Sequence, residues 1–262
     1  MAKTNNLTDF LTSLAAKFRK SLGTSGAINP QDFESKVDAV YAAGKKSEYD
    51  AFWDSYQKNG TRTNYYYAFA GVGWTRENLL PKYAIKPSNA RMMFANSNIT
   101  DISEPFNGIS LDFSACEMFD SFGFWSSITK VPKITIGNIA DNYVSAFKSA
   151  WKLKTIVELA FPTSSPLLGT GSTADVFYGC SALENITVTG TIMNTGFDLH
   201  WSTGLTTESL TSILTALSKD SAVASGKTIT LPTTAQEKIN GNTAAKGQYD
   251  AALAAGWTIA FG

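Results

Sequence analysis

The sequence has few of the residues that most often carry enzyme chemistry. It contains a single histidine, His200, and two cysteines, Cys116 and Cys180. Nucleophilic and metal-dependent enzymes commonly need a histidine with suitable partners, and the carboxylate close to His200 in sequence is Asp198. Two cysteines supply neither a disulfide framework nor a zinc set. We therefore interpret His200 as a structural or exposed residue and Cys180 as a small buried one, and we predict no enzyme activity, no cofactor and no metal.

The chain also lacks an excess of charge of either sign. Lys plus Arg and Asp plus Glu number 22 each, so the formal net charge is zero, and charged residues make up 17% of the chain. Without a basic stripe or a polybasic run, the composition does not favour binding to nucleic acid or to an anionic membrane. Copies of a weakly charged chain repel one another little, which is compatible with packing into an assembly. We expect a homo-oligomer that binds no nucleic acid.

Long apolar runs are absent too. No window approaches the ~18 uninterrupted apolar residues that a membrane-spanning helix needs. Residues 1–6 lead into an amphipathic stretch rather than into the charged and then apolar pattern of a signal peptide. We therefore expect a soluble protein that is made in the cytoplasm and is not inserted into a membrane.

What the first sixty residues do contain is helical patterning. Apolar residues recur at helical spacing over residues 7–22. A second helix is predicted to begin at Asn29-Pro30, because asparagine is a good N-cap and proline suits the first helical position. A third is expected over about 47–58. Residues 1–60 are thus predicted to form three helices with short connections.

A short phrase then recurs along the chain. Its clearest copy steps from Phe177 through Cys180 and Leu183 to Ile186, and earlier copies begin at Phe94, Phe122 and Phe147, with spacings of 28, 25 and 30 residues. Self-similarity at such periods is typical of stacked repeats, because one repeat cannot bury its apolar face alone. Each phrase is expected to place its Phe and its small residue on an inward-facing turn and to close on a short strand. The strands expected from the phrases cover residues 134–136, 156–159 and 186–189.

The last sixty residues vary this theme. A helix is expected around Leu210–Leu217, a strand over 227–231, two short helical stretches near 234–239 and 244–255, and a closing strand at 257–261. The predicted fold class is therefore α+β: an N-terminal helical segment, an irregular leucine-rich-repeat solenoid with short stacked strands, and a C-terminal capping repeat. The corresponding segments are 1–60, 61–204 and 205–262.

Two patterns that could indicate catalysis or nucleotide binding are weak. Residues 168–174 match a Gly-x-Gly-x-x-Ala fingerprint, but no buried strand precedes it, so we interpret it as a loop. The acidic pairs Asp101 with Glu104 and Asp112 with Glu117 are spaced like ordinary surface acids. A glycan depolymerase, which would need two cooperating carboxylates, is accordingly less favoured.

Aromatic residues provide the candidate binding sites. The cluster around residues 65–74 is either a junction core or an exposed platform for sugars or a protein, since aromatic faces suit both kinds of partner. Trp151, with Lys148, Lys152 and Lys154 nearby, is a second candidate. The complete candidate set for binding a partner or a glycan is Tyr65, Tyr66, Tyr67, Trp74, Trp151 and Trp201.

The Met-Phe pairs at Met93 and Met118, the phrase at 177–186 and the Val-Pro-x-Ile step at 131–134 resemble the BspA-like class of leucine-rich repeats. The whole chain is similar to leucine-rich-repeat proteins encoded by bacteriophages and prophages of gut bacteria. Residues 7–33 resemble a segment that phage tail and virion-appendage proteins use repeatedly.

This resemblance implies a virion structural protein, such as a tail or baseplate appendage or a fibre-like adhesin. Its partners would be other virion proteins and a glycan or protein of the host surface. The helices of 1–60 would dock it to the particle through Phe10, Leu14, Phe18, Phe33 and Val37. A head decoration or head-fibre protein with a purely structural role and a bacterial surface adhesin remain alternatives.

Overall fold

The computed structural model describes residues 16–17, 19–20, 50–74, 79, 81–106, 108–113, 116, 119–135, 145–161, 176–192, 198–218 and 228–262. The chain clusters into two compact units, Met1–Asn59 and Gly60–Gly262. The predicted boundary at residue 204, inside the second unit, stays a prediction. In the described part of the chain, no helix combines the length and hydropathy that crossing a membrane requires.

Most of the described residues of the first unit belong to one helical segment, residues 50–56, and to the turn after it. Trp53 is 1% exposed there, whereas Phe52, which the sequence pattern places on the inner face, is 46% exposed and stacks on Tyr56 with ring centroids 5.4 Å apart. The helix ends at Tyr56, and Lys58 and Asn59 in the turn that follows both have positive φ. The predicted docking residues, Phe10, Leu14, Phe18, Phe33 and Val37, lie outside the described residues.

In the second unit, tight turns of one kind recur. Each contains two positive-φ residues four positions apart, and in the described turns these pairs are Tyr67 and Gly71, Met92 and Asn96, Ser121 and Trp125, and Ser145 and Ser149. Neighbouring turns are joined by backbone hydrogen bonds. The amide of Phe69 donates to the Met93 carbonyl at 2.8 Å, and that of Phe94 donates to the Phe122 carbonyl at 3.2 Å. The turns therefore lie against one another in chain order.

Phenylalanine side chains fill the inside of these turns. The Phe69 and Phe94 rings lie 5.5 Å apart, those of Phe94 and Phe122 5.3 Å, and those of Phe147 and Phe177 5.8 Å. All five side chains are at most 3% exposed. Ring pairs at these separations stabilise a core by roughly 0.5–1.5 kcal/mol beyond the burial of their area. We call this set, Phe69, Phe94, Phe122, Phe147 and Phe177, the inner phenylalanine column.

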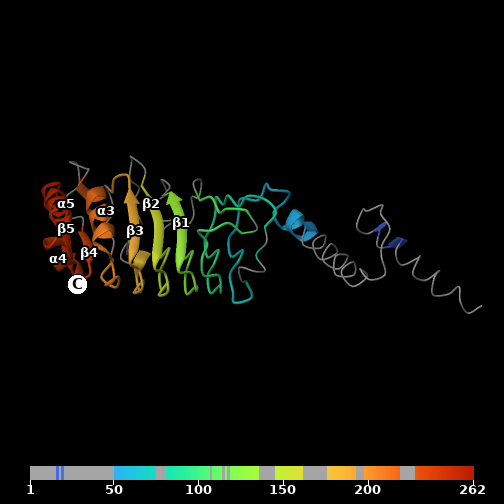
Figure 1. The fold of residues 1–262 in the computed structure, drawn as a ribbon, viewed down its shortest axis with the longest axis horizontal. Coiled ribbons are helices and arrows are strands. Elements are labelled where there is room, and N and C mark those ends of the chain that lie inside the picture. Colours follow the sequence, from blue (N-terminus) through green and yellow to red (C-terminus); the bar gives the residue numbers. More distant parts are fainter. Residues whose placement is uncertain are drawn as a thin grey trace, which may run out of the picture. The chain divides into compact units, whose positions relative to one another are not determined.

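Strands β1 (Lys130–Thr135), β2 (Thr155–Ala160) and β3 (Asn185–Thr189) form a parallel sheet in the order β1-β2-β3 (Figure 1). Val131 is paired with Ile156, and Ile156 with Ile186, and all three are buried. Adjacent side chains of a strand point to opposite faces, and accordingly Lys133, Val157 and Thr187, which lie next to the buried Ile134, Ile156 and Ile186, are exposed. One face of this sheet thus covers the core and the other is open.

Helix α3 (Thr207–Ser218) closes the β3 edge of the sheet. The Ser209 hydroxyl accepts from the Ile186 amide at 3.0 Å and donates to the Glu184 carbonyl at 3.1 Å. The Ser212 hydroxyl accepts from the Val188 amide at 2.9 Å. An exposed strand edge offers unpaired backbone groups to another strand. Here serine side chains occupy them, so the sheet ends at β3.

The C-terminal part follows with β4 (Thr228–Leu231), α4 (Thr233–Asn240), α5 (Thr243–Ala254) and β5 (Thr258–Phe261). Strands β4 and β5 pair in parallel as a second sheet, and α3 packs against α5 and α4 (Figure 1). The Asn242 side chain caps α5 by accepting from the Ala245 amide at 2.9 Å. The α3, α4 and α5 interface and the two-stranded sheet thus form a second, smaller packing group.

The fold-class prediction, an irregular leucine-rich-repeat solenoid with a capping repeat, is wrong. The five strands of the described residues belong to two separate small parallel sheets, not to one continuous sheet. On the N-terminal side of β1, strand pairing is reduced to isolated bridges such as Asp101 with Lys130 and Ile85 with Leu111. On the other side, the sheet ends at β3 because serine hydroxyls of α3 form hydrogen bonds with the backbone groups that a fourth strand would pair with.

Candidate functional site

Exposed aromatic side chains gather on the outside of the turns. Strands β1 and β2 are each preceded by one of these turns and β3 by a turn that contains Gly179 at positive φ; because the strands are parallel, the three turns lie at the same end of the sheet (Figure 1). The residues concerned are between 41% and 61% exposed: Tyr66, Tyr67, Trp125, Trp151, Tyr178 and Trp201. We call this set the aromatic edge. Several large rings left in water along one edge are a feature of interaction surfaces.

Neighbouring rings hold one another in place along this edge. Tyr178 and Trp201 meet edge to face with centroids 5.5 Å apart, and Trp125 stacks on Phe124 at 5.7 Å. The imidazole of His200 lies 4.8 Å from the Trp201 ring. These contacts restrict the motion of the rings in the unbound protein, so less conformational entropy is lost when a partner binds.

Cationic side chains accompany three of the rings. Lys152 Nζ lies 4.9 Å from the centre of the Trp151 ring, Lys148 Nζ lies 5.6 Å from that of Tyr178, and the Arg91 guanidinium lies 6.0 Å from that of Tyr66. Cation–π contacts of this kind contribute about 0.5–1 kcal/mol at exposed sites. The edge therefore combines flat apolar faces with hydrogen-bond donors of positive charge.

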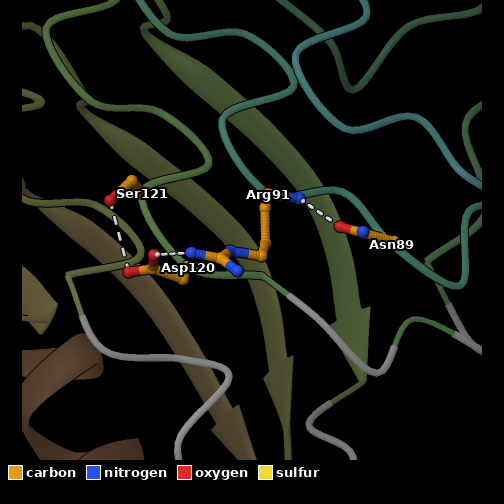
Figure 2. Close-up of polar contacts among 4 residues, drawn as sticks. All are labelled: Asn89, Arg91, Asp120 and Ser121. Carbon is orange, nitrogen blue, oxygen red and sulfur yellow. Dashed lines mark hydrogen bonds and ion pairs between the residues drawn. The ribbon is translucent and has the colours of Figure 1, made fainter.

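Arg91 also joins two turns through a polar network (Figure 2). Its Nη2 donates to Asp120 Oδ2 at 3.3 Å, and the Ser121 hydroxyl donates to the other carboxylate oxygen at 3.2 Å. The Arg91 amide donates to Asn89 Oδ1 at 3.0 Å. The Arg91 Nε atom is buried and has no hydrogen-bond partner among the described residues. The network fixes the guanidinium beside Tyr66, at the start of the aromatic edge.

At the other end of the edge, Asp198 orients His200. Asp198 Oδ1 accepts from the His200 amide at 2.8 Å and lies 2.6 Å from the ring Nδ1. Ser202, two residues further on, donates its hydroxyl to the Cys180 carbonyl at 3.1 Å and is buried. The carboxylate and imidazole are therefore arranged to hold the Trp201 turn, and the hydroxyl of Ser202 faces away from them into the core.

The cysteines belong to the interior. The Cys180 thiol donates to the Phe147 carbonyl at 3.1 Å, and burial raises its pKa to about 12. Cys116 is buried as well, and its thiol donates to the Ser88 carbonyl at 3.8 Å. Since the thiolate is the reactive form, Cys180 is held as an inert thiol. No group of three or more His, Cys, Asp or Glu side chains within the described ranges is placed to hold a metal ion.

The structure separates the predicted binding residues into two groups. Tyr66, Tyr67, Trp151 and Trp201 lie on the aromatic edge, whereas Tyr65 is 1% exposed. Trp74 is partly buried and packs its ring 5.4 Å from Phe69. Both interpretations of residues 65–74 therefore apply, to different side chains. Tyr65 is part of the core, whereas Tyr66 and Tyr67 are exposed, as a platform would require.

Three residues of this surface were not predicted from the sequence: Trp125, Tyr178 and Arg91. Tyr178 directly follows the buried Phe177, so the phrase itself could have placed it on the opposite side. For Trp125 the phrase gave the wrong side: this residue occupies the second, inward step of the copy that begins at Phe122, yet it is 61% exposed, with a positive φ of 52° that is rare for a bulky residue. Arg91 acquires its role through Asp120, which is distant in sequence.

The acidic pairs show no shared site among the described residues. Asp101 accepts from the amide and the hydroxyl of Ser103, both at 2.7 Å, while Glu104 lies 4.0 Å from Lys130. Asp112 lies 3.6 Å from Lys86. Glu117 and the glycine-rich residues 168–174 lie outside the described residues.

Comparison of the chain with protein-family models, with curated proteins and with solved structures yields no match.

Proposed function

We propose that the protein is a virion appendage that binds the surface of a host cell through the aromatic edge, without catalysing a reaction. The observation that carries this proposal is the set of exposed rings on several turns of the second unit, with cations beside three of them. The virion setting is supported by the resemblance of residues 7–33 to segments of phage tail proteins.

A glycan of the cell surface suits this edge best. Sugar rings present apolar C–H faces that stack on aromatic rings and hydroxyls that accept hydrogen bonds from Lys148, Lys152 and Arg91. A typical hot-spot aromatic contributes 2 kcal/mol or more to a binding interface. Weak contacts at several turns add up, and copies of the protein on one particle multiply the effect through a high effective concentration.

The test is binding of the full-length purified protein to susceptible bacterial cells. The triple variant Trp125→Ala, Trp151→Ala, Trp201→Ala should lose at least about 30-fold in apparent affinity, the equivalent of one hot-spot residue. The control is Leu253→Ala, since Leu253 is 41% exposed on α5 and lies outside the aromatic edge. Binding by the triple variant at the wild-type level would refute the role of the edge.

A purely structural role, as in head decoration, predicts a different outcome. The wild-type protein would then be found on particles but would not bind cells, and the triple variant would assemble into particles normally. Treating the cells with periodate separates the two host ligands, because it destroys glycan diols and leaves most protein surface intact. Loss of wild-type binding after this treatment is the expected result.

A further inference from the structure

A pocket opens on the outer face of the three-stranded sheet, between β2, β3 and the start of α3. Its volume is about 220 Å³. It is lined by the outward side chains of both strands and by the first turn of the helix, with Thr155, Val157, Asn185, Thr187 and Glu208 as the members that carry the argument. None of these residues takes part in the aromatic edge.

The base of the pocket is rigid. The Thr206 and Ser209 hydroxyls lie 2.9 Å apart, and the Thr206 hydroxyl accepts from the Ser209 amide at 3.2 Å. The Ser209 hydroxyl is further engaged with the backbone of Glu184 and Ile186. These two lining residues are therefore committed to capping α3 and closing β3, so the groups available to a ligand come from the other lining residues.

The remaining lining groups suit a ligand rich in hydroxyls. The Thr155 and Thr187 hydroxyls and the Asn185 amide can both donate and accept, and the Glu208 carboxylate accepts. Val157, which is 43% exposed, offers an apolar contact beside them. A sugar ring has this combination of alternating hydroxyls and an apolar C–H face.

The volume of the pocket and the charge of its lining limit which ligands it can bind. Pockets for drug-sized ligands span roughly 300–1,000 Å³, so 220 Å³ fits a single small ring. The lining contains one carboxylate, Glu208, and no lysine or arginine, which disfavours an acidic sugar. The first residues of β2 and β3 border the pocket, and these are the strand ends at which the aromatic edge lies.

We propose that this pocket is a subsite for one uncharged monosaccharide unit of the glycan bound by the aromatic edge. The inference deepens the proposed function and rests on it. Rings stacked on Trp151 and neighbouring turns would supply affinity. The pocket would select the sugar by its hydroxyl pattern, since a site that hydrogen-bonds the hydroxyls of one ligand rejects an analogue that lacks them.

The subsite is tested by amide chemical-shift titration of the full-length ¹⁵N-labelled protein. The probes are the methyl glycosides of glucose, galactose, mannose and N-acetylglucosamine, with glucuronic acid and glucosamine as charged comparisons. At least one neutral glycoside should shift the amides of Val157, Thr187 and Glu208 in a saturable way, at concentrations up to ~50 mM, well above a dissociation constant of about 1 mM.

Two variants probe the lining. Glu208→Gln keeps the shape and removes the charge, and Thr187→Val keeps the shape and removes a hydroxyl. Each should weaken binding of the neutral glycoside about tenfold, the loss expected when a hydrogen bond to the ligand is removed. The matched control is Thr228→Val, an exposed threonine on β4 outside the pocket, which should change nothing.

Several outcomes would overturn the subsite. No saturable shift with any neutral glycoside would do so, as would binding of glucosamine alone, which would indicate an amine site at Glu208. Unchanged affinity in both variants would place the sugar elsewhere. These results differ from failure of the proposed function: if the triple tryptophan variant loses cell binding while the pocket amides do not move, the aromatic edge stands and the subsite falls.

Discussion

The inner phenylalanine column and the aromatic edge come from the same turns, yet their rings have opposite environments. Phe177 is fully buried and the next residue, Tyr178, is 43% exposed; Phe122 is fully buried and Trp125 is 61% exposed. The difference shows that aromatic content alone does not separate the core from the exposed surface in this protein. The position of a residue within the turn does, because residues one or three positions apart face opposite sides. Stability and binding should therefore respond to different substitutions.

The largest expected effect separates these two sets of rings. Phe122→Ala removes a ring that stacks on Phe119 at 4.1 Å and meets Phe94 at 5.3 Å. Truncation of a buried Phe costs about 3–5 kcal/mol, so the free energy of unfolding measured by denaturant titration should fall by that amount. Trp125→Ala, three residues later, should change it by no more than ~0.5 kcal/mol. Equal losses in the two variants would contradict the division between column and edge.

A second prediction concerns the small polar side chains of the interior. Ser209→Ala leaves the Ile186 amide without its acceptor and removes one of two donors to the Glu184 carbonyl, which also accepts from the Thr206 amide at 2.9 Å. An unsatisfied buried polar group costs about 1–3 kcal/mol, and thermal or chemical unfolding should show a loss of that size. Thr211→Ala on the same helix is the control, because its hydroxyl donates to the Thr207 carbonyl within α3 and supports no strand. A loss in the control as large as in Ser209→Ala would remove the special role of the sheet edge.

The buried thiol of Cys180 predicts a loss of stability in alkali. Burial raises its folded pKa from 9.0 to about 12, so the unfolded chain releases this proton first. The stabilisation is complete below pH 9 and is lost as the pH rises toward 12, with a slope of about 1.4 kcal/mol per pH unit for one proton. Comparing the alkaline limbs of unfolding curves for the wild type and Cys180→Ala isolates this contribution. Identical limbs would show that the thiol does not titrate as its burial requires.

The smallest expected effect lies on the outer sheet face. Hydrogen bonds from Lys133 at 2.8 Å and from Thr189 at 2.7 Å lower the pKa of Glu158 below its ordinary value of 4.5. A lowered folded pKa stabilises the protein above pH 4.5 and ceases to do so as the pH falls through that folded pKa. Lys133→Met should cost about 0.2–1 kcal/mol at neutral pH, as for other exposed ion pairs. The cost should shrink in acid and in high salt; a cost that is independent of both would point to lost packing instead.

Local elements were largely predictable from the sequence. The strands expected at 156–159 and 186–189 lie within β2 and β3, and the helix expected around 210–217 lies within α3. The step from Phe177 through Cys180 and Leu183 to Ile186 is buried throughout. These predictions succeed because apolar periodicity reports which side chains must leave water, and burial is a property that each short segment expresses by itself.

The surface was predictable only in part. Trp151 and Trp201 were identified as candidates, but Trp125 and Tyr178 were not, and Tyr65 belongs to the core. Residues such as Tyr67, Met92 and Trp125 adopt positive φ without being glycine. The sequence gives no sign of this, because the strained backbone is maintained by hydrogen bonds to neighbouring turns that are 23 to 29 residues away.

By itself, the sequence determined the inside of the protein: which phenylalanines and aliphatic residues pack, and where strands and helices form. Only the tertiary structure decided where the sheet ends and which aromatic rings share one edge. Both depend on long-range partners, the serine hydroxyls of α3 on β3 and the turn-to-turn hydrogen bonds. The spacing of apolar residues within a short segment predicts which side chains are buried. The hydrogen-bond partners of backbone groups depend on segments that are distant in sequence.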